Sequence, residues 1–395
     1  MSAFVSDPDR LQHLDMLRSS ALAFTVKESP LSRARALRAK PSGFDLHFWN
    51  ALASQGWTGL LAPESAGGYG QGFAEMAVVV TELAAQAAPE PATPVLVFAG
   101  RVLQACTRNK IAQDLLSELV EGGALPAVAW QEDTSGAAGF DAAGGLAEPA
   151  TVCARRGQTL TLRGGKRHVR PGAAATGYIV SASSTEGLVL VWVPAQSTGL
   201  TKTSERLADG TYAARLVFDN IELPVSHVLA FGAAAEAALA GAYDEALVFT
   251  GVELLAVSRR MLAMTLEYLR TRKQFGKLIG SFQSLQHRTV DMLIQQELSD
   301  AVVAHTIAEL DRGCSGNERA LLAARVKSRC SEAALMIGRE AVQLHGAIGV
   351  TDDYDLGLYL QRALVLAAWL GNARMQRGRF TSVSRRLAPT AEATV

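Results

Sequence analysis

The spacing of apolar residues divides the chain into three stretches. Up to about Glu121, apolar residues recur every three to four positions, which is the period of an amphipathic helix. Between Leu125 and about Pro224 the period falls to two, and short runs of β-branched and other apolar residues alternate with turns rich in glycine or polar residues. From Ala233 onward the helical period returns. The pattern therefore predicts helices, then strands, then helices.

Particular runs locate these elements. Four strands are expected at 159–162, 178–182, 188–193 and 214–218. In the first stretch, the proline-rich segment 88–94 should interrupt one helix and precede another, from about Leu96 to Cys106. Four long helices are expected in the last stretch, with apolar stripes at Leu254, Val257, Met261, Met264 and Tyr268; at Val303, Ile307 and Leu310; at Cys330, Ala334, Ile337, Ala341 and Leu344; and at Leu360, Leu364, Ala367 and Gly371.

These patterns predict an α+β multidomain fold. We expect an N-terminal α-helical domain at 1–124, a central β-barrel or sandwich domain at 125–227, and a C-terminal four-helix bundle at 228–395. A chain of 395 residues, of which 49% are hydrophobic, is long enough for two or three domains with a large buried core.

Charge and cysteine usage narrow the function classes. The 38 basic and 38 acidic side chains leave no net charge, so no nucleic-acid partner is expected. The four cysteines are scattered and form no CxxC pair, which argues against a disulfide framework and against a metal site. The first residues are charged where a signal peptide would be apolar, and the alanine-rich stretch 228–243 is interrupted by polar residues and glycines. We therefore expect a cytoplasmic protein that does not enter the membrane.

The densest chemical pattern lies just past the midpoint, at the end of a predicted helix. Arg272 can place two N–H groups on a phosphate, Phe275 can cover a purine, and Gly276 lets backbone approach a ligand. Gln283 and Gln286 follow on the first turns of the next helix. The block suits one end of a dinucleotide cofactor. The alternative is a basic helix end that interacts with the helix dipole.

Three blocks in this order resemble the acyl-CoA dehydrogenase family. The first is Trp57-x-Gly-Leu with Gly67-Gly-Tyr-Gly, the second is Arg272-x-Gln-Phe-Gly with Ile279-x-x-Phe-Gln-x-x-Gln, and the third is Gln343-Leu-His-Gly-Ala-Ile-Gly. In the third block Ala347 replaces the family's second glycine. The resemblance covers nearly the whole chain and implies FAD as cofactor. It is nearest to bacterial small-subunit or pimeloyl-CoA dehydrogenase-like types that act on dicarboxylic, aromatic or steroid-like acyl groups.

The resemblance assigns cofactor contacts to residues of two subunits. Arg272 would hold the pyrophosphate and Phe275 the adenine, with Gln283 beside them, while Gln343 and Gly346 would bind across a dimer interface. Asn372 would replace the threonine that touches the flavin. Cofactor binding shared between subunits makes a tetramer, homomeric or heteromeric, part of the expectation.

The β domain would contact the flavin ring through two segments that depart from the family pattern. Gln131, in the run 129–136, stands at the family's threonine position and can donate an amide N–H. Trp130 is either a flavin contact or a core aromatic. His168 stands where the family usually has an aromatic, and Arg170 where it has threonine. The alternative for His168 and Arg170 is a solvated cluster of charges at a strand edge.

The catalytic base is missing from both positions that the resemblance offers. Leu370 stands where many members have glutamate, and Ala246 stands where others have it. Leu370 would line the substrate site, and Asp244 matches a residue that contacts CoA in relatives. Glu245 is one step, about 100° around a helix, from the second position, so it is either a displaced base or a helix-terminal carboxylate. Glu253 is a further candidate.

Three functions follow from the resemblance. The first is FAD-dependent α,β-dehydrogenation of an acyl-CoA thioester by Glu245 or Asp244, with an electron-transfer flavoprotein as the expected acceptor. The second is a non-catalytic or half-catalytic subunit of a heteromeric acyl-CoA dehydrogenase. The third is a flavin monooxygenase of the same fold, against which the phosphate-binding block at Arg272 argues.

Overall fold

The computed structural model describes residues 7–40, 42–132, 145 and 147–387. The N-terminal region is helical. Its helices are α1 (Pro8–Glu28), α2 (Leu31–Leu37), α3 (Leu46–Ser54), α4 (Phe73–Ala85), α5 (Gly100–Ala105) and α6 (Lys110–Val120). The helix predicted from Leu96 begins earlier, because a π-helical turn at Thr93–Ala99 runs directly into α5. Pro94 fits at that start, since the first helical N–H groups lack an intrahelical partner.

The central region is one sheet. Its strands are β1 (Pro126–Ala129), β2 (Val152–Arg156), β3 (Thr159–Val169), β4 (Gly177–Ser184), β5 (Gly187–Pro194), β6 (Leu200–Arg206), β7 (Tyr212–Pro224) and β8 (Val228–Phe231). They lie in the order β6-β7-β3-β2-β4-β5-β8, and β1 pairs with β4 in parallel. The four predicted strand runs lie within β3, β4, β5 and β7. The sheet continues past residue 227, because β8 pairs with β5.

Alternation along the strands gives the sheet two buried faces. Tyr178 and Val180 of β4 belong to the core within the β region, whereas Ile179 between them belongs to the large helical core. Trp192 of β5 likewise faces the helices. Since successive strand residues point to opposite faces, this pattern packs the sheet directly against the helices. The side-chain amide of Asn109, which caps α6, adds a polar link by donating to the carbonyl oxygens of Ser226 and Val228.

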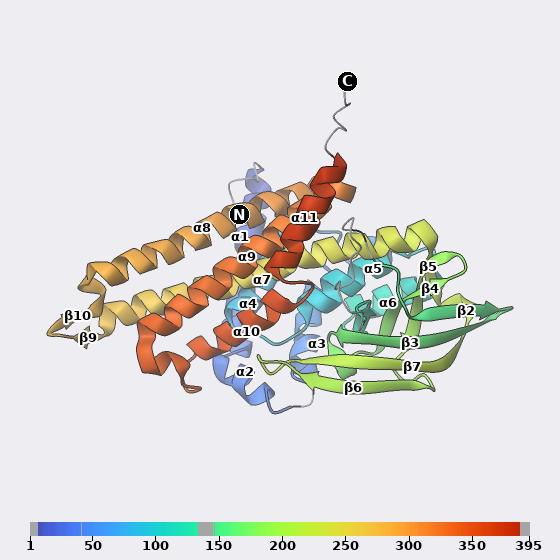
Figure 1. The fold of residues 1–395 in the computed structure, drawn as a ribbon, viewed down its shortest axis with the longest axis horizontal. Coiled ribbons are helices and arrows are strands. Elements are labelled where there is room, and N and C mark those ends of the chain that lie inside the picture. Colours follow the sequence, from blue (N-terminus) through green and yellow to red (C-terminus); the bar gives the residue numbers. More distant parts are fainter. Residues whose placement is uncertain (1–6, 41, 133–144, 146, 388–395) are drawn as a thin grey trace, which may run out of the picture.

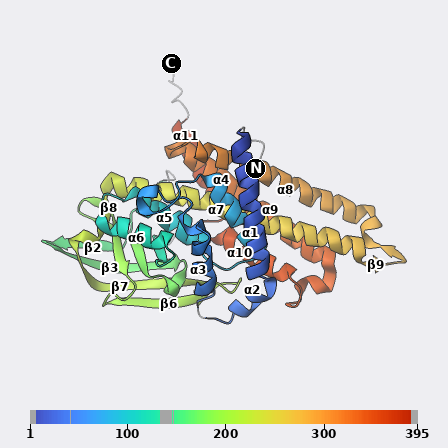
Figure 2. The same cartoon turned by 180° about the vertical axis from the view of Figure 1, so that it is seen from behind.

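The C-terminal region holds α7 (Gly232–Thr271), α8 (Gln283–Asp311), α9 (Gly316–His345), α10 (Leu356–Ala368) and α11 (Ala373–Leu387). Figure 1 shows α7 running from the sheet, beside α8 and α9, to a distant end where the hairpin of β9 (Lys273–Gln274) and β10 (Lys277–Leu278) lies. Figure 2, from behind, shows α1 and α4 against these helices. The family-type architecture is thereby confirmed.

The last predicted helix, whose stripe was expected to reach Gly371, ends at Ala368, and a further helix, α11, follows it. Leu370 and Gly371 have φ values of +58° and +91°, which a helix cannot accommodate, so α10 ends before them. The Oδ1 atom of Asn372 then accepts the Met375 amide and caps α11. Short 3₁₀ turns occur at Trp57–Gly59, Glu64–Ala66, Gly172–Ala174, Val225–His227, Ile279–Ser281 and Gly346–Val350. No helix in the described ranges has the length and apolarity to cross a bilayer.

Candidate functional site

A cavity of about 450 Å³ lies between the sheet and the C-terminal helices, and we call it the inter-domain cavity. Its lining comes from the end of β1, the end of β3, the β6–β7 turn and the break between α10 and α11. Among the residues that line it are four of the predicted cofactor contacts, namely Gln131, His168, Arg170 and Asn372. No described residue of this lining is acidic, so hydrogen-bond donors and one buried cation characterise the cavity.

Arg170 is the buried cation. It is 6% exposed, and its guanidinium lies 5.0 Å from the ring centre of Trp369, which also lines the cavity. One terminal nitrogen donates to Thr211 Oγ1 at 3.4 Å, while the other, Nη1, has no hydrogen-bond partner among the described residues. Burial, with a further contribution from Arg362, lowers the pKa of Arg170 to about 10, while Asp209 and Glu253 oppose the shift. The alternative of a solvated charge cluster is therefore wrong for Arg170.

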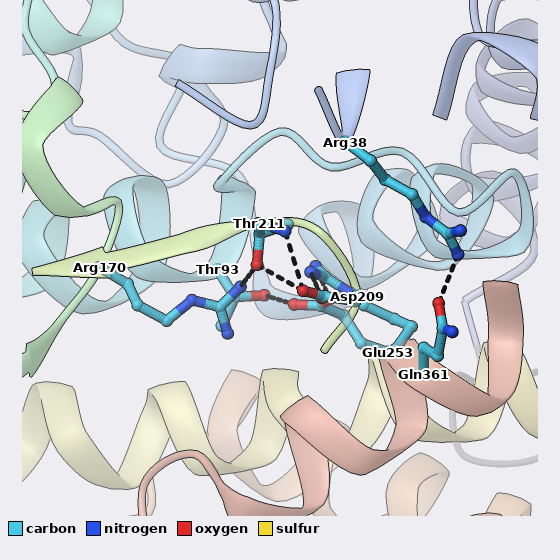
Figure 3. Close-up of polar contacts among 8 residues, drawn as sticks. Arg38, Thr93, Arg170, Asp209, Thr211, Glu253 and Gln361 are labelled. Carbon is cyan, nitrogen blue, oxygen red and sulfur yellow. Dashed lines mark hydrogen bonds and ion pairs between the residues drawn. The ribbon is translucent and has the colours of Figure 1, made fainter. Parts of the chain in front are cut away.

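A buried ion-pair network lies behind the cavity wall (Figure 3). Arg362, on α10, donates to Asp209 Oδ2 at 2.9 Å and to Glu253 Oε2 at 2.7 Å. The other oxygen of Glu253 accepts from Thr93 Oγ1 at 2.6 Å. Burial opposes the charge of Arg362, but Glu253 and Asp209 outweigh it and raise its pKa. Glu253, a further candidate base, is thus bonded on both oxygens.

The break between α10 and α11 is held from two sides. Leu370 is 1% exposed, and its carbonyl oxygen accepts from Tyr243 Oη at 2.5 Å and from Gln376 Nε2 at 2.8 Å. From the other side, Lys327 Nζ donates to the carbonyls of Ala367 at 2.9 Å and Gly371 at 3.0 Å. The backbone that forms this part of the cavity wall is therefore fixed. The side chain of Leu370 offers no proton acceptor.

The carboxylates of Asp244 and Glu245 are buried on α7 but do not line the inter-domain cavity. Glu245 accepts from Arg101 Nε at 2.6 Å and from a second nitrogen of Arg101 at 3.2 Å, and Arg319 lies 3.7 Å away. Asp244 lies 2.6 Å from Arg379 Nη1. Burial raises the pKa of Asp244 although Arg379 and Arg319 lower it.

Trp130 lies apart from the cavity lining. Its ring is buried and meets Tyr243 edge-on, with centroids 5.0 Å apart. The structure thus places it in the core beside the cavity. The rest of the run that follows Gln131, at 133–136, lies outside the described residues.

A second cavity, of about 700 Å³, lies at the distant end of the long helices and contains Arg272, Phe275, Gln343 and Gly346. We call it the bundle-end cavity. Phe275 and Gly276 have φ values of +51° and +76° and form the two-residue turn of the β9–β10 hairpin, which leaves Phe275 88% exposed. Gln283 is exposed at the start of α8, next to Ser284 in the lining. This end offers a guanidinium and an exposed aromatic face.

Both cavities fit parts of FAD. The inter-domain cavity has donors without carboxylates and an unpartnered buried N–H, as the acceptor edge of a flavin ring requires. The bundle-end cavity has a guanidinium for phosphate and a free aromatic for a base.

Sequence reasoning missed the buried basic residues around the site. Lys327 and Arg362 interrupt apolar helix stripes, and both are buried, as is the side chain of Lys166. A charged residue on the apolar face of a helix was the available signal, since Lys and Arg are seldom buried without partners.

Two family descriptions match the chain and together cover more than half of it. They are the acyl-CoA dehydrogenase C-terminal domain at residues 242–384 and the acyl-CoA dehydrogenase N-terminal domain at residues 12–140.

Curated relatives agree with this match. Acyl-CoA dehydrogenase IpdE2 of Mycobacterium tuberculosis is 27% identical over 88% of this chain and 90% of its own length. The 3-sulfinopropanoyl-CoA desulfinase of Paraburkholderia xenovorans is also 27% identical, over 83% of this chain and 84% of its own.

Solved structures share the fold. The steroid ACAD Tcur3481-Tcur3483 superposes with a TM-score of 0.84 at 26% identity, covering 95% of this chain and 99% of its own. Butyryl-CoA dehydrogenase of Megasphaera elsdenii superposes with a TM-score of 0.82 at 22% identity, covering 97% and 100%. The chain belongs to the acyl-CoA dehydrogenase family, whose members are FAD-dependent oxidoreductases that act on acyl-CoA.

Proposed function

We propose that this protein catalyses α,β-dehydrogenation of an acyl-CoA thioester with a bulky, branched, dicarboxylic or steroid-like acyl group. The observation that carries the proposal is the inter-domain cavity, whose donors and single buried cation suit a flavin ring. The structural relative Tcur3481-Tcur3483 is described as a steroid ACAD, which supports a bulky acyl group as the substrate of this chain. An electron-transfer flavoprotein is the proposed electron acceptor.

In this function bound FAD would supply the acceptor for the hydride that leaves the β carbon of the substrate. The chain's own side chains orient and bind. Gln131 and Asn372 present amide donors to the cavity, His168 lies at its exposed rim, and Trp369 forms an apolar wall. Donors fixed in the cavity wall would orient a planar ring by its acceptor edge. Arg272 and Phe275 would hold the nucleotide end of a neighbouring subunit's cofactor.

We propose Glu245 as the group that removes the α proton, after it separates from Arg101. Two guanidinium N–H groups of Arg101 donate to the two carboxylate oxygens, and Arg319 lies 3.7 Å away, so both oxygens are engaged in this conformation. Substrate binding would therefore have to displace Arg101 before the proton moves. Once it is free of Arg101, the carboxylate would be available to accept the α proton.

Replacing Glu245 with Gln tests this role. The variant should keep FAD and lose substrate-dependent bleaching of the yellow flavin under anaerobic conditions by at least about 100-fold in rate, because general bases typically contribute that much. The matched control is Glu236→Gln, an exposed residue on the same helix. Bleaching at the wild-type rate in Glu245→Gln would discard Glu245 as the base.

A second candidate function is a half-catalytic or non-catalytic subunit of a heteromer. Leu370 and Ala246 stand where a base is expected, and Glu245 is paired with arginines, which favours a base supplied elsewhere. The name of one structural relative pairs two designations, Tcur3481 and Tcur3483. In this case the purified chain alone would not bleach, and co-expression with a related chain would restore the reaction.

Arg272 tests the nucleotide end. Arg272→Gln should raise the Kd for FAD by about 10- to 150-fold, since charge-assisted hydrogen bonds contribute about 1.5–3 kcal/mol. Fluorescence titration of the apoprotein measures the change. Lys273→Gln, the exposed next residue, is the control and should bind FAD as the wild type does. Unchanged affinity in Arg272→Gln would remove Arg272 from the cofactor site.

A further inference from the structure

We infer that Arg170 makes the inter-domain cavity favour the reduced, negatively charged state of its flavin over the oxidised, neutral state. The inference rests on the proposed placement of the flavin in this cavity. Arg170 would thus affect the redox equilibrium of the cofactor and not only its binding.

Arg170 lines the cavity and has no bonded counter-ion among the described residues. Within the described residues, no carboxylate lies at ion-pair distance from its guanidinium, which makes only a 3.4 Å bond to Thr211 and a contact with the face of Trp369. Its Nη1 has no hydrogen-bond partner. Because buried polar groups are normally hydrogen-bonded, this N–H group is available to an acceptor atom of a ligand.

The acidic residues nearest to Arg170, Asp209 and Glu253, are hydrogen-bonded to other side chains. Both oxygens of Glu253 are bonded, to Arg362 and to Thr93, and Asp209 accepts from Arg362 and from Thr211 (Figure 3). These two carboxylates and Arg362 leave one negative charge behind the wall, which offsets the charge of Arg170 at a distance. This charge permits Arg170 to stay ionised in a buried site while its donor remains free for the cavity.

Reduction changes the charge of the flavin ring. A hydride carries two electrons and one proton, so a neutral oxidised ring that accepts it gains one negative charge unless a second proton follows from solvent. A fixed cation in a site of low dielectric stabilises that charge much more than it stabilises the neutral ring. Charge placed near the ring is one of the ways in which a protein tunes a flavin.

Arg170→Gln is the decisive variant, because it keeps a polar side chain and removes the charge. We expect the ratio of affinities for reduced and oxidised FAD to fall at least tenfold, which equals a decrease of about 30 mV in the midpoint potential of a two-electron couple. The potential is measured by equilibrating the holoenzyme with reference dyes during enzymatic reduction. Arg170→Lys, which keeps the charge, should retain most of the wild-type potential.

Two further variants keep the test informative if Arg170→Gln folds poorly. Asp209→Asn removes a negative charge from behind the wall and should shift the potential in the opposite, positive direction. Arg38→Gln removes an arginine that bonds Gln361 in the same neighbourhood but does not line the cavity, and should leave the potential unchanged.

Other outcomes would overturn the inference. Equal weakening of oxidised and reduced FAD in Arg170→Gln would make Arg170 a group that merely orients the ring. An unchanged potential combined with weaker binding of an acyl-CoA that ends in a carboxylate would assign the charge to the substrate. A wild-type protein that takes up no FAD would overturn both this inference and the proposed function, whereas a potential shift in a protein that oxidises no acyl-CoA would overturn the proposed function alone.

Discussion

Arg362→Met should lower the free energy of unfolding by about 3–5 kcal/mol, the range for removing one partner of a buried ion pair. Arg362 is 7% exposed, and it is the shared partner of Asp209 at 2.9 Å and Glu253 at 2.7 Å. Methionine of similar length would fill the space but leave two carboxylates buried without their cation. Urea denaturation of the two proteins at neutral pH measures the loss.

Two comparisons separate charge from packing in this experiment. Adding Asp209→Asn and Glu253→Gln to Arg362→Met removes the stranded charges and should recover most of the lost stability. Arg377→Met breaks an exposed pair with Glu332 on the surface and should cost less than about 1 kcal/mol. If Arg362→Met cost no more than Arg377→Met, the network would not be an ion-pair core.

Lys327→Met should change the pH dependence of stability. Lys327 is fully buried, has no carboxylate partner among the described residues, and donates to the carbonyls of Ala367 and Gly371 and to Ser331 Oγ at 3.2 Å. Burial lowers its pKa from 10.5 to about 7, and Cys330 opposes this shift. Between these values the unfolded chain carries the proton and the folded protein does not, so unfolding takes up a proton.

The sign follows from the lowered pKa. The contribution of Lys327 to stability is complete above pH 10.5 and is lost as the pH falls towards 7. The stability of the wild type relative to Lys327→Met should therefore rise with pH between about 7 and 10.5, by up to about 1.4 kcal/mol per pH unit, and should level off below 7. Chemical denaturation of both proteins at a series of pH values gives this difference.

A second variant isolates the proton from the hydrogen bonds. Lys327→Gln keeps a donor for the break between α10 and α11 but cannot titrate, so it should differ from Lys327→Met in absolute stability and match it in pH dependence. A difference between wild type and both variants that stays constant from pH 7 to 10.5 would show that Lys327 remains charged in the folded protein.

Much of the fold was predictable from local pattern. The change from a helical period to a period of two and back placed the helices and four strands correctly, because backbone geometry fixes which residues share a face. Errors occurred at ends and breaks, as at Thr93 and Leu370, where a few residues of unusual backbone conformation outweigh the periodicity.

The chemical candidates divide in a similar way. The motif at Arg272 and the positions of His168 and Arg170 were visible in the sequence. Their burial and their partners were not visible in the sequence. Arg170 is buried against Trp369, which lies far from it along the chain. Glu245 was visible as a carboxylate near the expected base, but its pairing with Arg101 came only from the structure.

The sequence by itself determined the order of helices and strands and the family, because periodicity and motifs depend on residues that are close neighbours along the chain. Only the tertiary structure decided which charges are buried and what neutralises them. Asp209, Glu253 and Arg362 come from the β6–β7 turn, α7 and α10, and only the packing of these elements brings them within bonding distance. The electrostatics of a site depend on separation in space, which sequence separation does not specify.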